Sequence, residues 1–207
     1  LIEDSLFFGD RVHPARFHLQ KLWLHRASMK RYAAWLDDRV KRVDYREHTP
    51  EMDVLRETLD TLAEDGVESV VLSDPHDHLL ERRLRRHCER TRLEVKLLGT
   101  PMFLNTSEDN QAYRQTKKRW FMADFYKHQR RRLDVLMDGD EPVGERWSFD
   151  EENRKKVPKA LLKSIPKITH PTPDAIDEAA RTHVLNRYPK NPGRLEELVY
   201  PTSHESA

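Results

Sequence analysis

The sequence is poor in cysteine and glycine and has no long hydrophobic run. Cys88 is the only cysteine among 207 residues, which excludes an intramolecular disulfide and any zinc or iron–sulfur site that needs four thiolates from this chain. The six glycines do not fall into GxGxxG, GxxxxGKS or GxSxG spacing, so phosphate-binding loops and the hydrolase nucleophile elbow are excluded. No apolar run approaches the roughly 20 residues of a membrane helix, and no signal-peptide pattern opens the chain. We therefore expect a cytoplasmic protein with no membrane partner.

Neither sign of charge dominates, although charged residues make up 35% of the chain. Lys and Arg number 37 against 36 Asp and Glu, a net charge of +1. This balance excludes a protein that coats nucleic acid through bulk charge, so any basic surface has to be local. Two stretches are locally basic, residues 82–92 and residues 114–132.

The first half of the chain alternates between helical and strand patterns. Apolar residues at helical spacing predict helices over 17–38, from Thr49-Pro50 to Gly66, and after Asp74-Pro75. Strands are expected near the start of the chain and over 43–45, 67–72 and 93–98. Such alternation predicts an α/β fold, with a doubly wound, mostly parallel, Rossmann-like sheet and helices on both faces.

The pattern changes after residue 100. A basic helix carrying aromatic residues is expected over 111–137, a turn at 138–140, and one further helix over 174–186. Seven prolines punctuate residues 158–201. We therefore expect an α/β domain over 1–105 and a connector over 106–207 that lies on something larger.

A doubly wound sheet binds its ligand at the carboxyl ends of the strands. That geometry nominates Glu3 and Asp4 after the first visible strand, and Ser73 and Asp74 after the third, as lining of a pocket. The alternative for Asp74 is that it is simply a helix cap. No metal site is expected, because neighbouring residues such as His76, Asp77 and His78 do not converge on one ion in the first turn of a helix.

The basic helix over 111–137 interleaves aromatic side chains, Trp120 and Phe125 among them, with eight cations. This combination is typical of a surface that stacks on bases or of one that packs on a second domain, and packing is favoured because runs of aromatic residues on a helix are usually core. Both interpretations stay open at this point.

The most specific motif is PVGERWSFDEENRK, residues 142–155. It resembles the PVGGxWNFDxENR stretch of the deoxyribodipyrimidine photolyase-related proteins, also called iron–sulfur bacterial cryptochromes and photolyases. Residues 121–126 with Arg130 and Arg131, and residues 2–4 through 17–30, resemble the segments of that family before this stretch and at its start. The resemblance therefore covers essentially the whole chain.

The resemblance implies an N-terminal domain that holds an antenna chromophore, commonly a ribityllumazine, followed by an interdomain linker. It implies that FAD and an iron–sulfur cluster belong to a helical domain absent from this chain, and that damaged DNA is met through that parent protein. Contacts to DNA or to the helical domain would be made by Arg130, Arg131, Trp147, Asn153 and Arg154. Two departures from the family stand out: its first strand is missing here, and its Glu-x-x-Tyr motif is replaced by a segment beginning at Gly9.

We therefore expect an antenna-type domain and linker of a photolyase- or cryptochrome-like flavoprotein, involved in light-dependent DNA repair or blue-light sensing and not catalytic by itself. Two alternatives are a nucleic-acid-binding accessory module that uses the basic helix, and a stand-alone nucleotide-binding α/β module.

Overall fold

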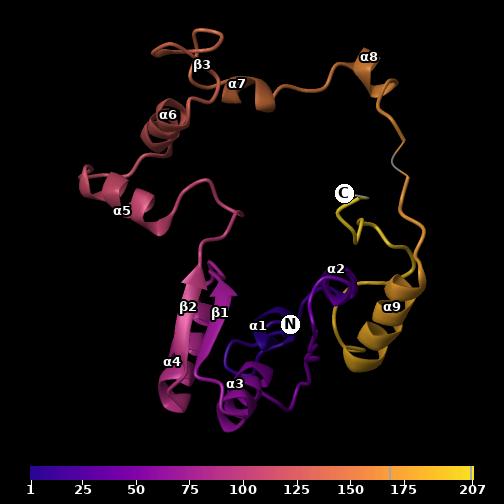
Figure 1. Ribbon diagram of the computed structural model, residues 1–207. Helices are drawn as coiled ribbons and strands as arrows, with labels where there is room; N and C mark the ends of the chain where they lie inside the picture. Colours follow the sequence, from indigo (N-terminus) through magenta and orange to yellow (C-terminus); the bar gives the residue numbers. More distant parts are fainter. Residues whose placement is uncertain (168, 206) are drawn as a thin grey trace. The chain divides into compact units, whose positions relative to one another are not determined.

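The computed structural model describes residues 1–167, 169–205 and 207. The chain divides into two compact units, unit 1 with residues 1–100 and 168–207, and unit 2 with residues 101–167. Figure 1 follows the elements along the chain. In unit 1 these are α1 (Ser5–Phe8), α2 (Leu19–Asp37), α3 (Val54–Glu64), β1 (Ser69–Ser73), α4 (His78–Thr91), β2 (Glu94–Leu98) and α9 (Ala175–Arg187). In unit 2 they are α5 (Ser107–Gln115), α6 (Met122–Leu133), β3 (Met137–Asp138), β4 (Glu141–Pro142), α7 (Asp150–Asn153) and α8 (Lys159–Leu162).

Unit 1 has the expected α/β character, with a smaller sheet. Strands β1 and β2 pair in parallel, with Ser69 opposite Glu94 and Ser73 opposite Leu98. The start of the chain contributes one isolated parallel bridge, between Ile2 and Arg46. The α/β class is confirmed, but the strand expected over 43–45 is wrong: the bridge forms at Arg46, and the backbone of residue 44 only accepts a hydrogen bond from the N-terminal amine at 2.8 Å.

Two apolar clusters hold unit 1 together. In one, α3, α4 and β2 bury Leu55, Leu59, Leu84, Cys88 and Leu93. In the other, α1 and α2 pack with α9 and the residues after it, burying Phe8, Leu19, Leu22, Trp23, Ala27, Ala180, Val184, Tyr188, Leu195 and Leu198. The second cluster shows that the chain returns to unit 1 after unit 2. This differs from the expected single connector over 106–207, because the apolar face of α9 is buried against α2.

The helices at the two Pro-containing turns start later than expected, by four residues after Thr49-Pro50 and by three residues after Asp74-Pro75. Helix α3 is capped by Asp53, which accepts from the Arg56 backbone, and α4 is capped by Asp77, which accepts from two backbone N–H groups of its first turn. Asp74, expected as a possible cap, instead accepts from the backbone N–H of His76.

The long basic helix expected over 111–137 is two helices. Helix α5 begins with a capping box between Thr106 and Asp109, and α6 begins after Phe121. The break spans residues 116–121, where three consecutive cations stand exposed. In a continuous helix, Arg114 and Lys118 would form a like-charged pair four residues apart, which is destabilising.

Candidate functional site

A buried polar network in unit 1 surrounds Glu3, whose side chain has no exposure to solvent. Arg26 of α2 donates through Nη1 to both carboxylate oxygens of Glu3, at 2.6 and 2.8 Å. The Tyr45 hydroxyl donates at 2.6 Å and the backbone N–H of His48 at 2.9 Å. Arg26 also donates to Glu47 at 2.7 Å. Because four donated hydrogen bonds from the protein occupy the two oxygens, Glu3 stabilises the fold and does not line an open pocket.

A second layer of this network links three parts of unit 1. His48 is almost fully buried, with Nδ1 at 2.8 Å from the Tyr188 hydroxyl and Nε2 at 3.1 Å from the Gly9 carbonyl. Since a carbonyl only accepts, Nε2 carries the proton and Nδ1 accepts from Tyr188. Burial lowers the pKa of His48 and raises that of Tyr188. Both side chains therefore stay neutral near pH 7.

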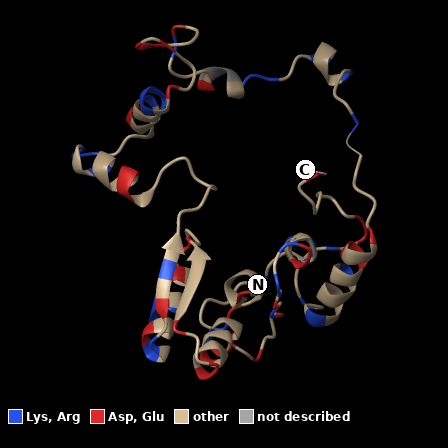
Figure 2. Ribbon diagram, viewed as in Figure 1, with Lys and Arg blue, Asp and Glu red and all other residues tan. Residues whose placement is uncertain are grey.

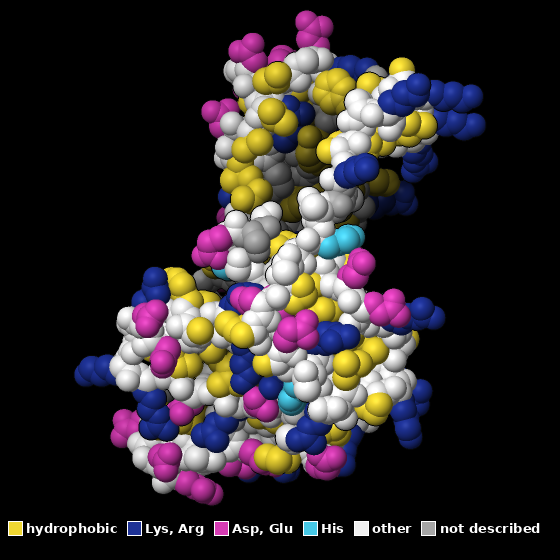
Figure 3. All heavy atoms as spheres, turned by 90° about the vertical axis from the view of Figure 1, so that its right-hand side faces the viewer, with side chains coloured by type: hydrophobic (Ala, Val, Ile, Leu, Met, Phe, Trp, Pro, Cys, Tyr) yellow, Lys and Arg dark blue, Asp and Glu magenta, His cyan; other side chains and the backbone are white. Residues whose placement is uncertain are grey.

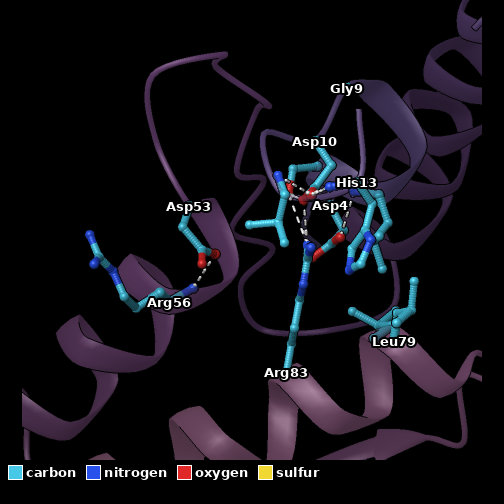
Figure 4. A network of polar contacts seen from close by, with 12 residues as sticks. Asp4, Gly9, Asp10, His13, Asp53, Arg56, Leu79 and Arg83 are labelled. Atoms are coloured by element: carbon cyan, nitrogen blue, oxygen red, sulfur yellow. Dashed lines mark hydrogen bonds and ion pairs between the residues drawn. The ribbon is translucent and has the colours of Figure 1, made fainter. Parts of the chain in front are cut away.

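Two carboxylates, Asp4 before α1 and Asp10 after it, form a cluster next to this network (Figure 4). Arg83 reaches from α4 to Asp10 at 2.5 Å, and Asp10 also accepts from the backbone of His13 at 2.6 Å. The bond from Arg83 depresses the pKa of Asp10 well below its usual range, whereas burial raises the pKa of Asp4. Asp4 caps α1 by accepting from the Leu6 backbone at 2.9 Å. The local role of Asp4 is thus to begin a helix.

The four expected pocket residues do not form one group. Glu3 and Asp4 belong to the buried clusters just described. Ser73 is exposed and Asp74 half-buried at the carboxyl end of β1, where the Asp74 backbone N–H donates to the Leu98 carbonyl at 2.8 Å. This places Ser73 and Asp74 together at the strand ends.

In unit 2, Arg130 is a buried structural anchor. Its guanidinium donates to the backbone carbonyls of Val135, Leu136 and Trp147. It also lies 5.3 Å from the centre of the Trp147 ring. These bonds tie the end of α6 to the β3–β4 hairpin and to the motif around Trp147, which explains why an arginine is buried there.

Of the other expected contact residues of unit 2, Arg131, Asn153 and Arg154 are exposed and Trp147 is half-buried. Arg131 lies over Trp147 at 4.5 Å from the ring centre, so that it and Arg130 both stack on this indole. Asn153 donates to Asp150 at 3.3 Å within α7, and Arg154 follows on the surface. Arg131 and Arg154 are therefore the two of this group that can offer a charge to a partner.

Unit 2 carries most of its apolar side chains on the outside. Among its described residues, the buried ones are Tyr113, Arg130 and Pro142. Its large exposed hydrophobic residues are Met102, Phe103, Leu104, Trp120, Phe121, Met122, Tyr126, Val135, Leu136, Val143, Phe149, Val157, Leu161, Leu162 and Ile165. The upper part of Figure 3 shows such side chains next to Lys and Arg. Exposed apolar surface of this extent makes unit 2 a candidate interaction surface.

Charge is also distributed unevenly between the units. Residues 101–167 contain 15 Lys and Arg against 11 Asp and Glu, a net charge of +4 in a chain whose total is +1. Within 111–132 there are eight cations and one carboxylate, Asp124. Figure 2 shows the cations on α5 and α6 and on the chain between α7 and α8. Unit 2 therefore presents a basic, partly apolar surface.

Neither a metal cluster nor a membrane-spanning helix is found in residues 1–167, 169–205 and 207. No three His, Cys, Asp or Glu side chains of these residues are placed to hold an ion. No helix among them is both long and apolar enough to cross a bilayer.

Comparison with known proteins decides the family. Residues 1–200 match the deoxyribodipyrimidine photo-lyase-related proteins. The chain belongs to this family. One relative, the "uncharacterized protein R852" of Acanthamoeba polyphaga mimivirus, is 33% identical over 166 residues, which are 78% of this chain and 84% of the viral protein. A (6-4) photolyase of Agrobacterium fabrum is 32% identical over 117 residues, covering 56% of this chain and 22% of the photolyase.

The photolyase-related chain is thus a photolyase-like module that spans about a fifth of the length of the Agrobacterium enzyme.

The sequence did not indicate the partners of its buried network, His48 and Tyr188 among them, because they lie up to 140 residues apart. One feature of the sequence does indicate the buried network. Arg26 occupies a position in the apolar stripe of α2, and a charged residue there requires a buried partner.

Proposed function

We propose that this chain is an antenna-type α/β domain and linker of a photolyase- or cryptochrome-like flavoprotein for light-dependent DNA repair or light sensing. In this proposal the chain is not catalytic by itself, and flavin and an iron–sulfur cluster belong to a helical partner domain. The observation that carries it is the exposed apolar surface of unit 2, in a member of the photolyase-related family. A unit of 67 residues that buries so few of its own apolar side chains is stabilised by a partner.

The docking surface we assign to the partner is the second half of unit 2. It consists of the exposed apolar residues Val143, Phe149, Val157, Leu161, Leu162 and Ile165. Cations at 154–156, 159 and 163 lie among them. This pattern fits a partner whose surface has apolar grooves with acidic rims.

Docking is tested by mixing the chain with a separately produced helical flavin domain of a photolyase-related protein and measuring association by sedimentation velocity. Leu161→Asp with Leu162→Asp should abolish association, because two charges would be buried in an apolar contact. Val12→Asp is the matched control, since Val12 is exposed in unit 1. Association that is absent in the wild type, or equal in all three proteins, overturns the docking proposal.

The antenna part of the proposal is supported by the position of Ser73 and Asp74 at the carboxyl end of β1, beside the end of the parallel strand β2, because ligands of such sheets bind at strand ends. After incubation with a ribityllumazine and desalting, the chain should retain about one chromophore. Ser73→Arg should prevent retention by filling the strand end, and Glu94→Arg at the opposite end of β2 should leave it unchanged. A colourless wild-type chain would remove the antenna role and leave docking standing.

A second candidate function, nucleic-acid binding, is favoured by one specific observation. Cations lie directly over aromatic rings in unit 2, with Arg114 at 4.7 Å from the centre of the exposed Trp120 ring and Arg131 at 4.5 Å from that of the half-buried Trp147 ring. Rings and cations interleaved in this way stack on bases and contact phosphates. The affinity for duplex DNA should then fall steeply with salt, whereas a flat salt response contradicts it.

A further inference from the structure

A cavity in unit 2 lies between α5 and α6. It has a volume of ≈ 550 Å³ and is lined by Asn110, Gln111, Tyr113, Arg114, Trp120, Phe121, Met122 and Phe125. This volume is within the range of small-molecule sites, and half of the lining residues are aromatic. Trp120 and Phe121 come from the break between the two helices, so the break is what opens the cavity.

Tyr113 forms the rigid wall of this cavity. It is 8% exposed, and its ring packs against Phe125 at 5.1 Å and His128 at 4.7 Å between centroids. Its hydroxyl is buried and has no hydrogen-bond partner among the described residues. Because a buried hydroxyl without a partner destabilises a fold, a ligand with a polar edge would satisfy it.

The opposite wall of the cavity is exposed. Trp120 is 63% exposed and Phe121 58% exposed, which leaves two large ring faces open to a planar ligand. Arg114 stacks on the Trp120 ring. Three further cations, residues 117–119, directly precede Trp120 in the sequence. A planar group with hydrogen-bonding edges, carried on a negatively charged chain, matches all these features.

We propose that this cavity binds one base of a single-stranded nucleic acid, with the adjoining phosphates held by residues 117–119. The proposal rests on the nucleic-acid function given above as the second candidate. A base is inserted beside Trp120, its polar edge reaches the Tyr113 hydroxyl, and the strand passes over the break between α5 and α6. A base paired within a duplex is not available to this cavity, so single strands bind more tightly than duplex.

The test uses fluorescence anisotropy of labelled 12-residue oligothymidine, with oligouridine, the matching duplex and an abasic strand of equal length as comparisons. Trp120→Leu should weaken single-strand binding by about 10-fold, as expected for the loss of one stacked base. Trp35→Leu is the matched control, because Trp35 is also exposed and also lies under an arginine, Arg39 at 4.1 Å, but belongs to α2. It should change affinity less than about 2-fold.

Tyr113→Phe separates a binding role from a structural one. If the hydroxyl serves a ligand, this variant binds oligothymidine several-fold more weakly while its free form is at least as stable as the wild type. Equal affinity of Trp120→Leu and wild type, or equal binding of the abasic strand, overturns the cavity proposal and leaves salt-dependent nucleic-acid binding intact. Absence of binding to every strand overturns both.

Discussion

Replacing Arg26 by methionine tests whether the buried charge network stabilises unit 1. The substitution keeps the apolar stem of the side chain and removes the guanidinium that donates twice to Glu3. Glu3 then remains as a carboxylate with no exposure and no cation at hydrogen-bond distance. Breaking a buried pair in this way costs about 3–5 kcal/mol. At a urea slope of about 2 kcal/mol/M, the midpoint of unfolding should fall by about 1.5–2.5 M.

Two further variants give the expected order of effects. Tyr45→Phe removes one neutral donor from Glu3 and should cost about 1.5–3 kcal/mol. Arg42→Met breaks an exposed pair with Asp44 and should cost less than about 1 kcal/mol. Unfolding is followed by far-ultraviolet circular dichroism and by tryptophan fluorescence, to which Trp23 of α2 contributes. If Arg26→Met and Arg42→Met unfold at the same urea concentration, the reasoning about the network is refuted.

Three other outcomes follow from the structure of unit 1. Because burial depresses the pKa of His48 below its usual 6.5, the unfolded chain takes up the proton first, and unfolding free energy should fall as pH drops below about 6.5. His48→Gln should flatten that fall in urea titrations between pH 8 and 5. Gly193→Ala should destabilise by more than about 1 kcal/mol, since its φ is +102° and a Cβ would meet His18, whereas Gly99→Ala, with open space around it, should be nearly neutral in thermal unfolding. Cys88 is buried and its pKa raised, so a thiol reagent should modify it at the rate of unfolding, and fast labelling of the folded chain would contradict its position.

Local patterns in the sequence predicted the elements that depend on local interactions. The apolar spacing after Phe17 predicted α2, and Asp174 was recognised as the start of α9 because an aspartate cap is a one-turn feature. At the two Pro-containing turns the predicted caps, Thr49 and Asp74, lie four and three residues before the observed ones. At each turn an aspartate further along the chain, Asp53 or Asp77, accepts hydrogen bonds from the first turn of the helix and takes the capping role.

Local sequence patterns could not predict the features that depend on residues far apart in the chain. The packing of α9 on α2 depends on residues 154 positions apart, such as the Trp23 indole that donates to the Asp177 carbonyl at 2.8 Å. Proline-rich sequence before and after α9 indicated a connector, but it says nothing about where the chain returns. The break at 116–121 was also missed, because helical periodicity continues across it and only the run of like charges argues against a helix there.

The two buried arginines show why the units respond differently to substitution. Arg26 neutralises a carboxylate inside a unit that already has two apolar clusters, so its loss is a loss of folding stability. Arg130 holds backbone carbonyls in a unit whose apolar side chains mostly face outward, so it shapes a surface more than it completes a core. Since the chain enters unit 2 from β2 and returns to unit 1 through α9, unit 2 is an insertion within the sequence of unit 1.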